Sequence, residues 1–412
     1  MTETTLTPEE VRSGRRRLRR RRLIAFLFVA PLLIYIFVSF VAPIGTMLYR
    51  SFYHPVVSQL IPRTLESLAG WDETGSEPPP AAATRNLAME LRGLARERRS
   101  GKLAEEVNRF LPGSSSLIKS TARKLKRLPP EAIGREPGVL AGIDPRWNGL
   151  PLWRAIKKSG VVVTDSFYLT ALDLTRNTAG EITQRETSVY LKLYLKSLKI
   201  ALYITLLTAL IGFPLAYYLA TAPTRVANLL LVFVLLPFWT SLLVRTTAWI
   251  ALLQTNGVVN STLAFLHLID EPIEMLYTQF STIIAMTHIL LPFMVLPLYS
   301  VMKGIDPSYL RAALSLGGRP LPAFVRIYLP MTTPGLAAGA LLVFIISIGY
   351  YITPALVGGT KGQMISNIIA FHMQSSNNWE LAAALGSLLL LLILVIYWVY
   401  DRLVGVSNIR FG

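Results

Sequence analysis

Six long apolar blocks constrain this chain more than any other feature of its sequence. They lie at about 23–48, 198–221, 226–253, 280–302, 334–357 and 381–404. A helix needs about 20 mostly apolar residues to cross a bilayer, and each block is long enough. The chain is 52% hydrophobic and only 16% charged, whereas an ordinary soluble domain is about 25% charged. The sequence therefore predicts an all-α membrane protein with six transmembrane helices.

The first apolar block, 23–48, follows a basic tail at residues 1–22 that holds eight arginines. A basic flank marks the cytoplasmic end of a spanning helix. The apolar part of a cleaved signal peptide has about 7–15 residues and ends at small residues. This block is about twice that long and has Pro43 near its end. The pattern favours an uncleaved spanning helix over a signal peptide.

Loop charges orient the six predicted helices. With a cytoplasmic N-terminus, the loop at 303–332 lies inside and carries four Lys or Arg against one Asp. The C-terminus then lies inside as well, and the loop between the third and fourth blocks lies outside, where it has three acidic residues and no Lys or Arg. This distribution follows the positive-inside rule. Lys192, Lys196 and Lys199 run against it, and we interpret them as part of an amphipathic lead-in helix at the membrane interface.

Residues 49–190 differ from the rest of the chain and are predicted to form an extracytoplasmic insertion. They hold 21 Lys or Arg and 15 Asp or Glu, with turn signals such as Pro112-Gly113. Helical periodicity appears in leucines from Leu87 to Leu128, and three tryptophans are available for a small core: Trp71, Trp147 and Trp153. Two interpretations stay open, a docking domain outside the membrane and a poorly ordered insert with no specific role.

Several kinds of chemistry have no sequence support. The chain has no cysteine, no Gly-x-x-x-x-Gly-Lys-Ser/Thr phosphate loop, no Gly-x-Ser-x-Gly elbow, and four histidines far apart. We predict no catalytic residue, metal or cofactor. The net charge of +17 would suit nucleic acid, but its placement next to spans points to membrane lipid instead, and no nucleic-acid partner is predicted. No span has an Asp or Glu at its centre, which disfavours an ion-coupled carrier.

The loop at 303–332 predicts a short helix between two spans. Asp306 can cap a helix that starts at Pro307, and Gly317-Gly318 can end it, about three turns later. Ala312 and Ala313 give this helix a small face that another protein can approach closely. The alternative is a helical hairpin that only joins two spans.

This loop resembles the signature of inner-membrane permease subunits of ABC importers, which reads Glu-Ala-Ala, three residues, Gly, nine residues, then Ile-x-Leu-Pro. Arg311-Ala312-Ala313, Gly317 and Ile327-Tyr328-Leu329-Pro330 match it in register, with Arg311 in place of the glutamate. In the family this loop forms a coupling helix that docks on the ATPase. The resemblance therefore implies a set of ATPase-coupling residues: Arg311, Ala312, Ala313, Gly317, Ile327, Leu329 and Pro330.

A narrower resemblance points to the spermidine/putrescine branch of these permeases. It rests on Leu236-Pro237-Phe238-Trp239-Thr240-Ser241, on Val244-Arg245-Thr246, on Leu291-Pro292-Phe293-Met294 and on Gly358-Gly359. The branch also contains opine and aminoethylphosphonate permeases. The insertion at 49–190 exceeds the loop of short spermidine permeases, so the resemblance leaves polyamine, opine and phosphonate cargo open.

Four residues are candidates for the substrate pathway. Arg245 follows 19 uncharged residues from Val226, about 28 Å of helix, so we place it near the outer interface. There it either snorkels or pairs locally, or serves an outer gate. Trp239, Trp249 and Tyr350 can stack on an organic cation, or belong to an interfacial belt. Gly335 and Gly339 form a small-xxx-small repeat that suits close helix packing, within the chain or between two permeases.

The resemblance implies a complete architecture. It predicts a type I ABC importer permease fold in the bacterial inner membrane, with a cytoplasmic tail (1–22), a first helix (23–48), the insertion (49–190) and a five-helix core (191–412). The implied partners are an ATP-binding subunit dimer, a second permease subunit and a periplasmic solute-binding protein. Two rivals from other classes are a secondary carrier without an ATPase and a membrane scaffold whose working part is 49–190.

Overall fold

The computed structural model describes residues 8–135, 138–177 and 181–404. The chain divides into two compact units, Met1–Asp165 and Ser166–Gly412. In the described part, five helices are long and apolar enough to cross a membrane: Arg20–Phe52, Tyr190–Thr221, Gln279–Gly304, Pro320–Gly349 and Trp379–Arg402. A bent pair, Thr224–Trp239 with Leu242–Phe265, passes the same test together, which allows up to six spans. The predicted all-α membrane fold is confirmed.

The first unit contains one spanning helix followed by a bundle of short helices, which we call the helical domain. Its elements are α1 (Pro8–Ile36), η1 (Phe37–Val41), α2 (Ala42–Phe52), α3 (Val56–Leu60), α4 (Pro62–Leu68), α5 (Ala81–Arg96), α6 (Ser100–Phe110), α7 (Ser114–Arg127), α8 (Pro130–Arg135), α9 (Val139–Ile143), η2 (Pro145–Asn148) and α10 (Leu150–Ser159). The predicted tail at 1–22 is partly helical, since α1 begins at Pro8; residues 1–7 lie outside the described residues.

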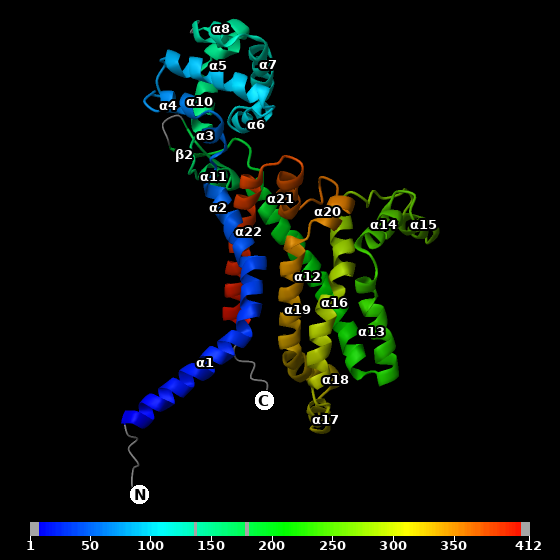
Figure 1. Cartoon of the computed structure of the whole chain (residues 1–412). Helices are drawn as coiled ribbons and strands as arrows, with labels where there is room; N and C mark the ends of the chain where they lie inside the picture. The colour runs from blue at the N-terminus through cyan, green and yellow to red at the C-terminus, as the bar shows by residue number, and fades with distance from the viewer. Residues whose placement is uncertain (1–7, 136–137, 178–180, 405–412) are drawn as a thin grey trace. The chain divides into compact units, whose positions relative to one another are not determined.

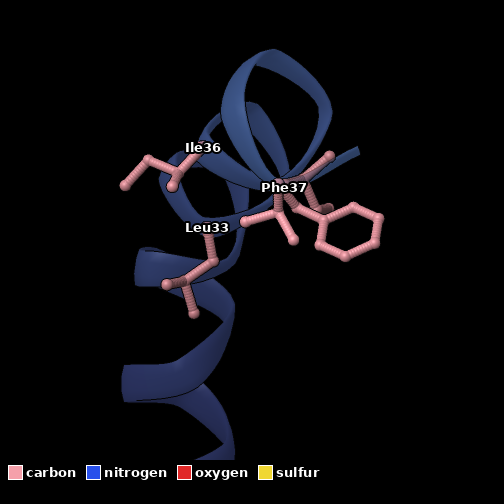
Figure 2. A pocket seen from close by; sticks show the side chains of 5 residues that line it. Leu33, Ile36 and Phe37 are labelled. Carbon is pink, nitrogen blue, oxygen red and sulfur yellow. The ribbon is translucent and has the colours of Figure 1, made fainter. Parts of the chain in front are cut away.

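The spanning helix of the first unit contains a π-helical turn, η1, just before Pro43. The Ala42 N–H donates to the Phe37 carbonyl, and Pro43 has no N–H with which to continue the ladder. A wide turn of this kind makes room for the proline ring. Beside it, Leu33, Ile36 and Phe37 line a shallow apolar hollow, shown in Figure 2. Because the hollow is apolar and lies on a spanning helix, it suits hydrocarbon rather than a polar ligand.

The helical domain has its own hydrophobic core. Helices α5, α6 and α7 pack on one another and bury apolar side chains at helical spacing, as Leu87, Leu91 and Leu94 do in α5. The three tryptophans predicted for a core are all buried in it. Their indole N–H groups are satisfied as well: Trp147 donates to Thr121 Oγ1 at 2.9 Å and Trp153 donates to the Trp147 carbonyl at 2.8 Å. The described residues from Val57 to Ile156 therefore pack as a folded domain rather than as a poorly ordered insert.

The second unit contains the remaining spans. Its elements are α11 (Ser166–Ala171), β1 (Leu174–Arg176), β2 (Ile182–Gln184), α12 (Tyr190–Thr221), α13 (Thr224–Trp239), α14 (Leu242–Leu253), α15 (Val258–Phe265), α16 (Gln279–Gly304), α17 (Ser308–Ser315), α18 (Pro320–Ala323), η3 (Phe324–Tyr328), α19 (Leu329–Gly349), α20 (Ile352–Val357), α21 (Ile365–Gln374) and α22 (Trp379–Val404). The antiparallel pair β1–β2, with Thr175 opposite Thr183, is a small addition to the predicted all-helical fold.

Helices α12, α16 and α19 pack side by side and form the core of the second unit (Figure 1). Glycines let them approach closely. A Cβ at Gly339 would lie 2.9 Å from Met294 Sδ, and one at Gly335 would lie 2.9 Å from the Pro297 carbonyl oxygen. The small-xxx-small repeat thus packs within the chain, against α16.

Three predicted helix boundaries need correction. The block 226–253 is not one helix, because Thr240 and Ser241 adopt extended backbone and the chain bends by 98° there. The block 334–357 is displaced: its helix runs from Pro320 and ends at Gly349, so Pro354 lies in the separate helix α20. The lead-in lysines at 192–199 belong to α12 itself, which is continuous from Tyr190 to Thr221.

Candidate functional site

The short helix α17 lies at one end of the second unit, between α16 and α19 (Figure 1). Asp306 caps it: its Oδ1 accepts the Ser308 N–H at 2.8 Å. This hydrogen bond, with one from the Ser308 hydroxyl, lowers the pKa of Asp306 below its usual value. The helix begins at Ser308, not Pro307, and ends at Ser315. It is therefore shorter than the three turns that the sequence predicts.

A Schellman motif ends α17 at the two predicted glycines. The Gly318 N–H donates to the Ala313 carbonyl and the Gly317 N–H to the Leu314 carbonyl, each at 3.0 Å. Gly317 has a φ of +85°, which costs glycine nothing but strains other residues. A Cβ at Gly318 would lie 2.6 Å from the Ala313 carbonyl oxygen. Local backbone geometry thus favours glycine at 317 and excludes a Cβ at 318, independently of any partner.

Helix α17 buries none of its residues in the chain. Arg311, Ala312 and Gly317 are exposed, and Ala313 is half-buried. Three large apolar side chains of this segment are exposed as well, Tyr309, Leu314 and Leu316, the last at 89%. These three were not singled out from the sequence, although large apolar residues in a loop between two spans were the available signal. Small and apolar exposed side chains together form a surface suited to protein contact.

The second half of the signature attaches the loop to the helix core. Tyr328 is buried, and its ring lies 5.3 Å from those of Phe324 and of Tyr217 on α12. Phe324 also contacts Tyr217, edge to face, at 5.4 Å. We call these three rings the aromatic seat. It holds η3 against α12.

The matched Ile-x-Leu-Pro segment also sets the shape of this attachment. The Leu329 N–H donates to the Phe324 carbonyl in a π-helical turn, and Pro330 follows directly, as Pro43 follows η1. Ile327 and Leu329 are half-buried beside the aromatic seat, whereas Pro330 is exposed. In this chain, Ile327 and Leu329 therefore lie at the base of the loop, and Pro330 occupies an exposed position in the first turn of α19.

Two of the four predicted pathway residues, Arg245 and Trp249, lie one turn apart on the same face of α14. The Trp249 Nε1–H donates to His288 Nδ1 on α16 at 3.3 Å, and the two rings lie 5.7 Å apart. One turn earlier, the Arg245 guanidinium donates through Nη2 to the Thr240 carbonyl at 3.0 Å. Sequence reasoning missed His288, because only the folded chain brings α14 against α16.

The other two pathway residues lie elsewhere. Trp239 ends α13 and is 88% exposed. Tyr350 packs against the α12–α16–α19 core just beyond the end of α19. The structure therefore supports a local cluster of Arg245, Trp249 and His288, which we call the α14 cluster, and does not join all four predicted residues in one site.

The predicted glycine pair Gly358-Gly359 packs the segment after α20 against the start of α16. The Tyr277 N–H donates to the Val357 carbonyl at 2.8 Å. A Cβ at Gly358 would lie 2.3 Å from Thr282 Oγ1, and Gly359 has a φ of +52°. Only glycine fits both positions, so the pair has a structural role.

Comparisons with known proteins agree with this arrangement. Residues 212–405 match the family described as binding-protein-dependent transport system inner membrane component. The spermidine/putrescine transport system permease protein PotB of Escherichia coli K12 is 38% identical over 231 residues, which cover 55% of this chain and 84% of PotB. PotB of Haemophilus influenzae is 35% identical over 52% of this chain and 75% of its own length.

More distant proteins match as well. The inner membrane ABC transporter permease protein YdcU of E. coli is 29% identical over 62% of this chain and 87% of YdcU. A solved bacterial ABC transporter involved in the import of alginate has a TM-score of 0.42 at 18% identity, over 53% of this chain and 81% of that chain. The chain is a multi-pass inner-membrane protein, and it belongs to the family of inner-membrane permease components of binding-protein-dependent ABC importers, in the polyamine branch.

Proposed function

We propose that this chain is the permease subunit of an ATP-driven importer and forms part of the translocation pathway for a small organic solute. Hydrolysis of ATP takes place on a separate ATP-binding subunit dimer, and a second permease subunit completes the pathway. Closure of the ATPase shifts the permease between inward- and outward-open states because it binds one state more tightly.

The observation that carries this proposal is the loop from α17 to η3. Its helix is capped at both ends, exposes small and apolar residues, and is anchored to α12 through the aromatic seat. A rigid exposed helix joined to spanning helices is what mechanical coupling between two proteins needs. We assign the ATPase contact to Arg311, Ala312, Ala313 and Gly317, and the anchoring of that contact to Ile327, Leu329 and Pro330.

We further propose the topology that the loop charges predict, with both termini in the cytoplasm and 49–190 outside. The helical domain then faces the periplasmic solute-binding protein and helps to seat it. A reporter fused after Gly412 is expected to read cytoplasmic, and one inserted near Pro79, in the loop before α5, is expected to read external. The opposite result at either point would overturn this topology.

The proposed cargo is a polyamine of the spermidine or putrescine kind. The PotB relatives support this cargo, because the match to this chain extends over most of the length of each relative. Opine or phosphonate cargo is the alternative within the family. In the α14 cluster, Trp249 and His288 offer ring faces to an organic cation, while the charge of Arg245 opposes one. We propose cargo contact at Trp249, with Trp239 and Tyr350 as separate contacts elsewhere in the chain, while Arg245 holds the bend after α13 through its hydrogen bond to the Thr240 carbonyl.

Reconstitution tests this function directly. The permease pair, the ATPase and the solute-binding protein are placed in liposomes, and uptake of labelled spermidine is measured with ATP or with a non-hydrolysable analogue on the ATPase side. Uptake that requires hydrolysis and no ion gradient is expected. Uptake driven by a proton or sodium gradient without ATPase would indicate a secondary carrier, and uptake of an opine or phosphonate instead of spermidine would reassign the cargo.

A further inference from the structure

Helix α7 of the helical domain carries an exposed basic face. Lys119, Arg123, Lys126 and Arg127 recur at i, i+4, i+7 and i+8, which places them on one side of the helix. All four are exposed, and the helix contains no Asp or Glu. The opposite side, including Leu117, Ile118 and Leu125, is buried in the domain core.

Two neighbouring cations extend the positive charge of this face. Arg92 of α5 donates to the Leu128 carbonyl, directly after α7, at 2.9 Å, and Lys124 donates to the Ile143 carbonyl at 3.3 Å. In the part of the chain that the structure describes, neither these two nor the four cations of the α7 face form an ion pair.

Asp144, the acidic residue near Lys124, already has a charged partner. Asp144 accepts two hydrogen bonds from the Arg146 guanidinium, at 3.0 and 2.8 Å. These bonds and the backbone N–H of Arg146 lower the pKa of Asp144 to about 2, with a smaller contribution from the charge of Lys124. Its carboxylate thus has its partner within the domain and does not balance the α7 face.

Helix stability does not explain this arrangement. Cations in the last turn, such as Lys126 and Arg127, stabilise the helix C-terminus. Lys119 and Arg123 lie before that turn, however, and both Lys119–Arg123 and Arg123–Arg127 are like-charge pairs at i, i+4, which destabilise a helix. Because these like-charge pairs lower the stability of α7, we interpret the cations as selected for binding a partner.

The position of α7 indicates which kind of partner. Within the first unit, α7 and α8 lie at the end of the helical domain away from α2, the end of the spanning helix (Figure 1). The membrane that α2 crosses lies at the opposite end of the helical domain, and salt screens exposed charges over distance, so its headgroups are poorly placed to bind the α7 face. We infer that the α7 face binds an acidic surface of the solute-binding protein. This inference rests on the proposed placement of 49–190 outside the membrane.

A charge reversal with a matched control tests it. The complete transporter in lipid nanodiscs carries either Lys119→Glu/Arg123→Glu/Lys126→Glu or the control Arg63→Glu/Arg85→Glu/Lys158→Glu. Both sets change net charge equally at exposed positions, and the control lies on α4, α5 and α10. The Kd for the solute-binding protein of the same system is measured between 50 and 300 mM NaCl. We expect the α7 variant to weaken binding by about tenfold or more at low salt and to flatten its salt dependence, with the control near wild type.

Other outcomes separate this inference from the function on which it rests. If removal of 49–190 weakens binding but the α7 reversal does not, the domain docks through another face and the inference is wrong. If removal of 49–190 leaves both binding and ATPase stimulation unchanged, the proposed docking role itself fails. If the reversal instead reduces binding of the transporter to anionic vesicles and leaves the binding protein unaffected, the surface is a lipid contact.

Discussion

His54 Nε2 lies 2.8 Å from Glu106 Oε2, and both side chains are buried, with 4% and 7% exposed. His54 follows the end of α2, and Glu106 lies on α6, so the pair connects the spanning helix of the first unit to its helical domain. Arg109 Nη1 lies 2.8 Å from the same carboxylate oxygen. The carboxylate therefore serves two nitrogen groups at once.

Backbone hydrogen bonds reinforce this connection. The His54 N–H donates to the Val162 carbonyl at 2.7 Å, and the Thr164 N–H donates to the Phe52 carbonyl at 2.9 Å. These hydrogen bonds therefore join the two ends of the helical domain at the point where the spanning helix ends. The domain is thus attached through backbone hydrogen bonds and a buried side-chain pair.

Glu106→Ala is expected to destabilise the helical domain by about 3 kcal/mol, because it removes the carboxylate from a buried charged network. Glu105→Ala is the matched control, since Glu105 is the adjacent residue and is exposed. Hydrogen exchange of α6 in the full-length permease measures the effect. Equal protection in the two variants would show that this connection does not depend on the network.

Asp173 is expected to make the start of α12 sensitive to acid. Its carboxylate is buried and accepts the N–H groups of Val189, Tyr190 and Leu191 at 2.8–3.1 Å. Burial raises the pKa of Asp173, but these hydrogen bonds, with one from Ser188, outweigh it and leave the pKa below its usual value. A lowered folded-state pKa means that the stabilisation is present above the unfolded value, about 3.9, and is lost as pH falls through the folded value.

Hydrogen exchange at the first turn of α12 checks this expectation between pH 7 and pH 3. Protection should hold down to about pH 4 and then fall. Asp173→Asn should lower the local stability by about 1 kcal/mol at pH 7 and remove most of the acid-dependent part. Glu186→Gln, at an exposed position nearby, should behave as wild type. An acid-dependent loss that persists in Asp173→Asn would assign it to another group.

Gly317→Asp and Gly317→Asn separate the helix cap from the ATPase contact. Asn and Asp tolerate a positive φ to a similar degree, and a Cβ at Gly317 meets nothing within 4 Å in this chain. Both variants should therefore fold. A charge buried without a partner at an interface costs several kcal/mol, so Asp should weaken co-purification of the ATPase much more than Asn. Equal association of the two variants would place Gly317 outside the contact.

Arg311→Glu is expected to reduce ATPase association, because an arginine at this position implies an acidic partner on the ATPase. Reversal of that partner's charge should restore association. Lys303→Glu, an exposed cation before α17, is the control and should have little effect. Association and uptake that are indifferent to Arg311→Glu would mean that Arg311 faces solvent or lipid.

The sequence by itself determined the class of this protein. Lengths of apolar segments are set by bilayer thickness, so most of the spans were visible from composition alone, and the register of Ala312, Gly317 and Pro330 was enough to find the loop that resembles the permease signature. The capping of α17 was also predictable, because an Asp before a helix and two glycines after it act through local backbone geometry.

Other features depended on tertiary structure. The bend at Thr240–Ser241 interrupts a run of apolar residues that composition cannot distinguish from a straight helix. Three contacts illustrate this. Trp249 contacts His288 and His54 contacts Glu106 across 39 or more positions of sequence. The aromatic seat joins residues from different helices. Local propensity carries no information about such pairs, because their formation depends on how whole helices pack. For the same reason, the exposure of Leu316 and of the α7 cations became visible only once the buried face of each helix was known.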